Sequence, residues 1–279
     1  MIYSHGVRSG VITLLFCFAN GCVDQYSFQQ GQGDLAPPNS DLCTQNPNAD
    51  ACKRDPVVTT PGVVTILFTM QQIPQNAATL ILANAIKYAS PLQQPRILFL
   101  KDSATFGEDE GDSDFIMNTL LLGYDVEYKV IAGGGLTPAE VNNKDLVIIS
   151  NPGHPLANLQ TLTTLQAFAG GVILLGDDLS RGSSFSMDAF TGLTFKDNGS
   201  SMSCNGQTYQ YDNLQGHNYQ VSMNSIFLPG IPAAYQHYSY GNDIDITTAG
   251  TGVQVLAWAE AEAGTCNIGQ IPAVARKPR

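Results

Sequence analysis

The sequence predicts an α/β fold with an open, mostly parallel sheet, helices on both faces and an irregular, β-rich insertion. Short, continuous apolar runs, typical of strands buried on both faces, alternate with segments whose apolar residues recur at helical spacing. The chain has 279 residues and is 43% hydrophobic, which is sufficient for a large core. The alternation stops near residue 195, and residues 195–250 are rich in Gly, Asn, Ser and Tyr.

We expect residues 1–21 to be an export signal. Arg8 supplies a positive charge, and Val11–Ala19 is an apolar run too short for a transmembrane helix of about 20 residues. The run leads into Ala19-Asn20-Gly21-Cys22, which resembles the lipobox of bacterial lipoproteins. That resemblance implies that Cys22 is lipidated and becomes the first residue of the mature chain. An ordinary secretory signal cleaved nearby is the alternative.

A lipoprotein would be anchored in a membrane of a bacterial cell envelope, with palmitate among the acyl chains on Cys22. Val23 stands where an Asp can retain lipoproteins at the inner membrane, so we expect the outer membrane, with the domain facing the periplasm or the cell surface. Residues 22–61 lack periodicity and are rich in Gln, Asn, Pro and Gly, which predicts a flexible tether. The net charge of -11 argues against a nucleic-acid partner, which requires a basic face.

The cysteine count also favours export. Four cysteines remain besides Cys17 in the leader and Cys22. An even number in an exported chain predicts two disulfides, and four cysteines allow three pairings. Cys43–Cys52 would close a short loop and is the first choice, which leaves Cys204–Cys266 by elimination.

The domain begins at residue 62 with a buried strand over 62–70. A helix opens at Pro74 and continues to about Ala89; it is apolar nearly all round, so we expect it to be well buried. Residues 96–102 form the second buried strand. A polar loop follows, and then a helix from about Asp114 to Leu122, with Asp114 as its cap and Gly123 just beyond its end.

The second half of the sheet repeats this rhythm. Residues 125–131 alternate between apolar and charged, which suits a strand near the sheet edge. Thr137-Pro138-Ala139-Glu140 is a capping box that opens a short helix. Strands over 145–151 and 172–178 flank a helix that begins at Leu159 and ends before Gly170-Gly171.

The remaining chain, to residue 279, completes the same domain. Asn205-Gly206 in the insertion signals a hairpin. Strand-like patterning returns at 253–261 and 271–278. The insertion is also rich in tyrosines, which would either stack on sugars or pack an irregular β subdomain; they are Tyr209, Tyr211, Tyr219, Tyr235, Tyr238 and Tyr240.

Polar residues follow three of the predicted strands. Because open α/β sheets bind ligands beyond the carboxyl ends of their strands, we expect these residues to line one crevice. The crevice residues are Asp102, Asn151, His154, Asp177, Asp178 and Arg181. The acidic loop 108–114 is a candidate calcium site, with Asp109, Asp112 and Asp114 as ligands, because clustered carboxylates favour a hard cation. Ordinary helix capping and solvation are the alternative.

The segment Arg96–Gly182 resembles the class I glutamine amidotransferase-like family, including its ThuA-like and DJ-1-like relatives. The resemblance rests on RILFLKD, LLLGYDVEYKV, LTPAEV, KDLVIISN and GGVILLGDD, and it implies a Rossmann- or flavodoxin-like sheet. Catalytic members place a Cys on a sharp strand–helix turn, where Asp178 stands in this chain. The family also usually adds a strand after the position of 271–278, so we expect a truncated or edge-open C-terminus.

Since the thiol is missing, the first functional hypothesis is an exported, lipid-anchored binding or interaction protein whose ligand is a polysaccharide or an envelope protein. The second is an extracellular hydrolase that uses Asp177 or Asp178 with His154 as acid and base. The third is a purely structural envelope lipoprotein. No nucleophile motif decides between an enzyme and a binding protein.

Overall fold

The computed structural model describes the chain from Val58 onward, in the ranges 58–73, 75–102, 108–131, 135–150, 159–176, 179, 188–196, 201–210, 215–221, 242–243, 247–263 and 266–279. The predicted export signal, the lipid site at Cys22 and the Cys43–Cys52 bridge lie outside these residues. The end of the predicted tether is part of the domain, because Val58 packs against the core and the Pro61 carbonyl accepts a hydrogen bond from the Arg279 backbone.

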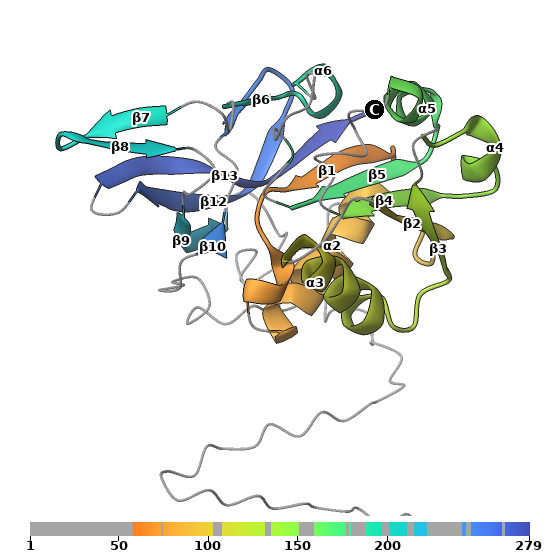
Figure 1. The fold of residues 1–279 in the computed structure, drawn as a ribbon. Coiled ribbons are helices and arrows are strands. Elements are labelled where there is room, and N and C mark those ends of the chain that lie inside the picture. Colours follow the sequence, from red (N-terminus) through yellow and green to blue (C-terminus); the bar gives the residue numbers. More distant parts are fainter. Residues whose placement is uncertain are drawn as a thin grey trace, which may run out of the picture.

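A single large sheet organises the described residues, with strand order β10-β9-β12-β13-β1-β5-β4-β2-β3 (Figure 1). Five strands pair in parallel: β1 (Gly62–Ile66), β5 (Gly171–Leu175), β4 (Leu146–Ser150), β2 (Ile97–Asp102) and β3 (Val126–Ile131). Four strands continue the sheet in antiparallel pairing: β13 (Cys266–Pro278), β12 (Gln254–Ala263), β9 (Gln215–Val221) and β10 (Asn242–Asp243). The α/β class is therefore confirmed, and the sheet is mixed.

Helices cover both faces of the parallel strands. Every residue of β1, β4 and β5 is buried, and since successive side chains point to opposite faces, both faces must be covered. Figure 1 shows α2 (Gln75–Ala89) and α3 (Glu108–Phe115) on one side and α5 (Leu159–Ala167) on the other. The short helix α4 (Pro138–Val141) begins with the predicted capping box, in which the Glu140 carboxylate accepts a hydrogen bond from the Thr137 backbone at 2.7 Å.

One predicted helix start is wrong. The helix expected from Asp114 begins at Glu108 and passes into a π-helical turn, η3 (Ile116–Leu120). Asp114 therefore lies inside the helix and does not cap it. The acidic residues 108–114 do not reveal where the helix starts, because carboxylates are favourable both in a solvated loop and in the first turns of a helix. The helical segment ends at Leu120, two residues before the predicted end, and Gly123 has the positive φ, +92°, expected of a glycine just beyond a helix.

The predicted edge-open C-terminus is also wrong. β13 lies between β12 and β1 and pairs with both. Its last residues hold two helices: the Arg276 side chain donates to the Tyr88 carbonyl near the end of α2, and the Arg279 side chain donates to the Leu165 carbonyl of α5. Cations at helix C-termini are favourable because the last carbonyls there have no partner within the helix. The sequence pattern of β13 showed a strand but carried no information about its neighbours.

The insertion is β-rich, as predicted, and part of it belongs to the main sheet through β9 and β10. The remainder includes β7 (Ser201–Cys204) paired with β8 (Gln207–Gln210), and β11 (Thr247–Ala249). β11 pairs with β6 (Leu193–Phe195), which follows α6 (Asp188–Thr191) at the start of the insertion. The predicted hairpin is confirmed, with φ of +53° at Asn205 and +79° at Gly206, as a tight turn of this kind requires. A disulfide joins Cys204 to Cys266 with a Cα–Cα distance of 6.3 Å.

Candidate functional site

The topology of the parallel strands places a switch point between β2 and β4. After β2 the chain goes to β3 on one side, and it then returns to β4 on the other side of β2. Connections diverge at such a point, which leaves room at the carboxyl edge of the sheet, and ligands of open α/β sheets bind there. β2 ends at Asp102 and β4 ends at Ser150, so these two ends mark the candidate site.

Buried polar groups gather at this edge. Ser150 at the end of β4 shares a 2.8 Å hydrogen bond with Ser113 of α3, and both side chains are fully buried. The neighbouring Asp112 is also fully buried, and its Oδ1 accepts a 2.7 Å hydrogen bond from the backbone N–H of Gln71. Gln71 belongs to the short 3₁₀ helix η2 (Met70–Gln72) that follows β1. Three elements that are distant in sequence therefore meet through polar contacts.

The sequence of α3 explains why these groups face inward. Asp112, Ser113 and Ile116 share one face of the helix, since residues three and four apart lie above one another. The first part of that face is polar and lies against η2 and the end of β4, while Ile116 and Leu120 continue it as apolar core. Burying a carboxylate is costly unless it is hydrogen-bonded, so the contact with Gln71 is a condition for this arrangement.

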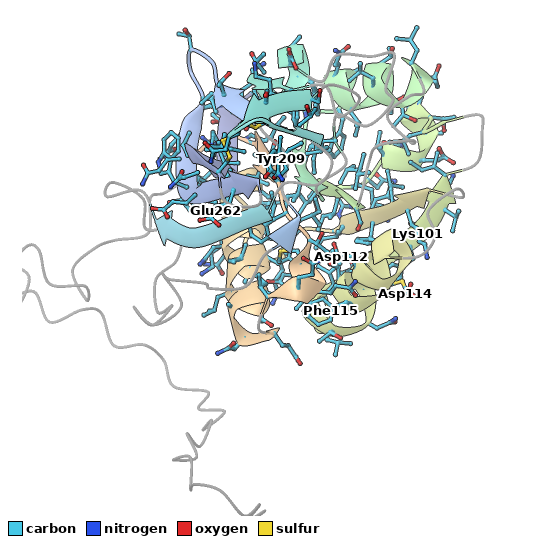
Figure 2. The ribbon with its side chains drawn as sticks, turned by 60° about the vertical axis from the view of Figure 1, so that its left-hand side comes forward. Lys101, Asp112, Asp114, Phe115, Tyr209 and Glu262 are labelled. Carbon is cyan, nitrogen blue, oxygen red and sulfur yellow. A yellow bond between two sulfur atoms is a disulfide. The ribbon has the colours of Figure 1, made fainter. Side chains whose placement is uncertain are left out.

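Two of the predicted calcium ligands, Asp112 and Asp114, make separate contacts. Figure 2 shows Asp112 and Asp114 on α3, with Lys101 of β2 nearby. Asp112 is buried against η2, whereas Asp114 is half exposed and lies 3.6 Å from the Lys101 ammonium group. The Asp109 side chain is outside the described part of the structure. Within the described residues, no group of three His, Cys, Asp or Glu side chains is arranged to hold a metal ion.

Most of the predicted crevice residues lie outside the described ranges: Asn151, His154, Asp177, Asp178 and Arg181. Asp102 is described as the last residue of β2, without its side chain. The strand ends that precede the others are adjacent, because Ser150 pairs with Leu175. Gly176 directly after β5 has a φ of +129°, a conformation that favours glycine, and its N–H donates to the Ile66 carbonyl. Asn151 and Asp177 thus follow neighbouring strand ends.

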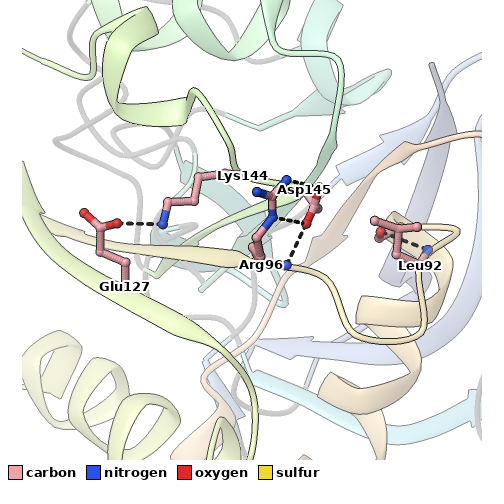
Figure 3. Close-up of polar contacts among 6 residues, drawn as sticks. Leu92, Arg96, Glu127, Lys144 and Asp145 are labelled. Carbon is pink, nitrogen blue, oxygen red and sulfur yellow. Dashed lines mark hydrogen bonds and ion pairs between the residues drawn. The ribbon is translucent and has the colours of Figure 1, made fainter.

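Charged pairs at the opposite edge of the sheet are structural. In Figure 3 the Arg96 guanidinium donates to both Asp145 oxygens, at 2.9 and 3.0 Å, and the Arg96 backbone N–H donates to the same carboxylate. The hydrogen bond from Arg96 holds the pKa of Asp145 below its ordinary value. Nearby, Lys144 lies 2.6 Å from Glu127 and lowers the pKa of that carboxyl group. The first pair joins the starts of β2 and β4, and the second joins the start of β4 to β3, away from the candidate site.

The tyrosine-rich insertion gives little information about a site. Tyr209 is the one tyrosine of the predicted set whose side chain is described; its hydroxyl donates to the Gln207 side chain at 2.6 Å. A hollow of about 240 Å³ lies near the end of β13 beside Phe190, Lys277 and Arg279. Both cations donate to backbone carbonyls there, which assigns them a role in holding α5 and α6.

Sequence reasoning missed Ser113, Ser150 and Gln71. Ser150 closes the buried strand 146–150, and its position at a strand end was a usable signal. Ser113 and Gln71 gave none, because their importance depends on contacts across 37 and 41 residues of chain.

No family model, curated protein or solved structure matches this chain. None of the helices in the described ranges combines the length and the apolar character needed to cross a membrane.

Proposed function

We propose that this chain is an exported, lipid-anchored binding protein of the bacterial cell envelope. Its domain would be an amidotransferase-like, flavodoxin-like α/β unit that has lost the catalytic thiol. It would bind an envelope polysaccharide or protein at the carboxyl edge of the parallel strands, between β2 and β4.

The observation that carries the proposal is the switch point between β2 and β4, together with the buried hydrogen bonds of Asp112 and Ser113 beside it. The relative order of β2, β3, β4 and β5 in the sheet, β3-β2-β4-β5, supports a flavodoxin-like arrangement, and β1, the first strand of the chain, lies next to β5. The hydrogen bonds of Asp112 and Ser113 fix α3 relative to η2 and β4. They therefore hold the base of this edge rigid, as a preformed ligand site requires.

The disulfide supports export. Cys204 and Cys266 are separated by 62 residues and are joined in the structure, and such bonds persist in oxidising compartments. The lipid anchor at Cys22 rests on the sequence resemblance alone.

The anchor is tested by expressing the full chain in a bacterial host and fractionating the membranes. We expect the wild type to be membrane-bound and to incorporate labelled palmitate, and Cys22→Ser to lose both properties. Cys17→Ser is the matched control and should keep them. Membrane retention of Cys22→Ser would overturn the anchor.

The binding site is tested by hydrogen exchange of the full chain with and without soluble oligosaccharides prepared from bacterial envelopes. We expect slower exchange in the segments that follow β2, β4 and β5. Protection confined to residues 195–250 would move the site to the insertion.

The same mixture distinguishes the hydrolase alternative, for which the adjacent ends of β4 and β5 provide the geometric basis. Release of reducing ends that is abolished by Asp177→Asn, Asp178→Asn or His154→Ala would establish a hydrolase. Binding without such release supports the binding protein.

A further inference from the structure

β3 is the edge of the sheet, and it carries an apolar face that is open to solvent. Within the described residues β3 pairs with β2 alone. Tyr128 and Val130 are 44% and 57% exposed, and Leu122, just before the strand, is 72% exposed. Exposed edge strands are templates for pairing with another chain, and proteins usually protect them with charges or bulges.

The charges on β3 do not protect it against a second copy of itself. Glu127 and Lys129 lie on the opposite face from Val126, Tyr128 and Val130, because side chains alternate along a strand. If two β3 strands pair antiparallel about a two-fold axis at Tyr128, Glu127 of each copy lies opposite Lys129 of the other. Val126 then lies opposite Val130 and Tyr128 opposite its own copy, so the exposed apolar side chains of the strand face one another.

The backbone of β3 has the right orientation for this register. The Asp125 carbonyl accepts a 2.9 Å hydrogen bond from Ile97, so Asp125 is directed toward β2. Backbone groups alternate in direction along a strand, and those of Val126, Tyr128 and Val130 therefore point outward. In the two-fold register these three residues would form hydrogen-bonded pairs, about six bonds in all. Glu127 and Lys129 would then occupy non-hydrogen-bonded positions, where cross-strand side chains are closest.

Other two-fold registers are less favourable. An axis at Glu127 or at Lys129 would place identical charges directly opposite each other, which is destabilising. Ion pairs within each copy also favour the register centred on Tyr128. Lys144 pairs with Glu127, and Glu140 pairs with Lys129, so cross-strand pairing would extend each of them into an alternating row of four charges.

We propose that two copies of this chain associate through their β3 edges, in an antiparallel pairing centred on Tyr128, and so join two sheets into one. The interface is small and reversible, since an edge-to-edge strand pair lies at the low end of protein interfaces, below ~1,200 Å².

Disulfide trapping in cells that express the full chain tests the register. Antiparallel hydrogen-bonded pairs have Cα atoms about 5.5 Å apart, so Tyr128→Cys should form a cross-linked dimer at the axis. Val130→Cys is the matched control on the same strand: its two copies would lie roughly 13 Å apart and should not cross-link. A mixture of Val126→Cys and Val130→Cys should cross-link. Equal trapping of Tyr128→Cys and Val130→Cys, or trapping of Tyr128→Cys to a protein of another mass, would overturn the proposal.

Charge reversal provides the second test, measured by sedimentation of the detergent-solubilised full chain. Glu127→Lys alone and Lys129→Glu alone each turn two attractive pairs into repulsive ones, so each variant should dimerise about tenfold more weakly. Mixing the two variants pairs an edge with two positive charges against an edge with two negative charges, and this should restore dimers. Since recovery requires both variants to be folded, it separates weakened pairing from misfolding. A wild type that stays monomeric at high concentration would contradict the proposal.

Discussion

At the residue scale, the charged side chains near the amino edge of the sheet show how pH acts on this fold. The Arg96 guanidinium and the Arg96 backbone both donate to Asp145, which stabilises the ionised carboxylate in the folded state. Because the pKa of Asp145 is lowered on folding, the unfolded chain binds more protons between the two pKa values. The contribution is therefore present above the unfolded value of about 3.9 and is lost as pH falls through the folded value.

This predicts that Asp145→Asn lowers the free energy of unfolding at neutral pH and flattens its rise with pH in the acid range. Urea unfolding of the wild type and the variant from pH 3 to pH 7 measures both effects. If the free energies of unfolding of the two proteins changed with pH in parallel, the contact between Arg96 and Asp145 would make no pH-dependent contribution to stability.

Arg276 illustrates a second residue-scale effect, a buried cation whose partners in the described part of the chain are backbone carbonyls. Its Nε donates to the Tyr88 carbonyl at 2.7 Å and its second nitrogen donates to the Thr60 carbonyl at 3.0 Å. Burial lowers the pKa of this guanidinium. Arg276→Met keeps the apolar stem but leaves the two carbonyls without these donors, so we expect a loss of about 1–3 kcal/mol.

Thermal or urea unfolding measures that loss. Lys87→Met on the exposed face of α2 is the matched control, since it removes one positive charge without a buried partner, and it should change stability by less than about 0.5 kcal/mol. If both substitutions lowered stability equally, the loss of a positive charge, and not the loss of buried hydrogen bonds, would account for the effect.

At the element scale, the contact between α2 and β5 depends on a glycine. A methyl group on Gly171, the first residue of β5, would lie 2.3 Å from the Ala89 carbonyl at the end of α2. Both elements are held by other contacts, α2 through Arg276 and β5 through its pairing with β4 and β1. Neither can shift freely to admit the methyl group.

We therefore expect Gly171→Ala to destabilise the fold by about 2–3 kcal/mol, which denaturant unfolding would detect. Gly123→Ala is the comparison, because φ at Gly123 is +92° but the space around it is open. Its cost should be the conformational strain alone, about 1–2 kcal/mol. A Gly171→Ala variant less affected than Gly123→Ala would show that α2 moves away at low cost.

At the scale of the whole molecule, the disulfide connects the outer hairpin to the start of β13. Cys204 ends β7, and Cys266 begins the strand that lies between the two halves of the sheet. The bridge therefore restrains a loop of 62 residues in the unfolded chain, which reduces its entropy.

Replacing both cysteines in Cys204→Ser/Cys266→Ser should lower stability by about 2–4 kcal/mol. Reducing agent should lower the melting temperature of the wild type to about that of the variant. It should leave the melting temperature of the variant unchanged. A reducing agent that lowers the melting temperature of the variant equally would assign the effect to other cysteines.

Local patterns predicted most elements of the domain. Continuous apolar runs located β1, β2, β4 and β5, and the capping box at Thr137–Glu140 located α4, because these signals arise from neighbouring residues. The start of α3 was missed since its first turns are acidic, a composition shared by loops. Within the site, the strand end at Ser150 was within reach of the sequence, whereas the partners Ser113 and Gln71 were not.

The sequence by itself predicted the main strands and helices and the hairpin turn at Asn205-Gly206, and it offered Cys204–Cys266 as one of three possible sets of cysteine pairs, which the structure then showed. The spacing of apolar residues and a turn-forming Asn-Gly pair are local properties of the chain, and the number of cysteines can be counted from it. Only the tertiary structure decided that β13 enters the middle of the sheet and that β2 and β4 meet at a switch point. The edge position of β3 was predicted from the alternation of apolar and charged residues over 125–131, and the structure confirms it. Strand order depends on pairing between segments far apart in the chain, and the spacing of apolar residues carries no information about which strands become neighbours.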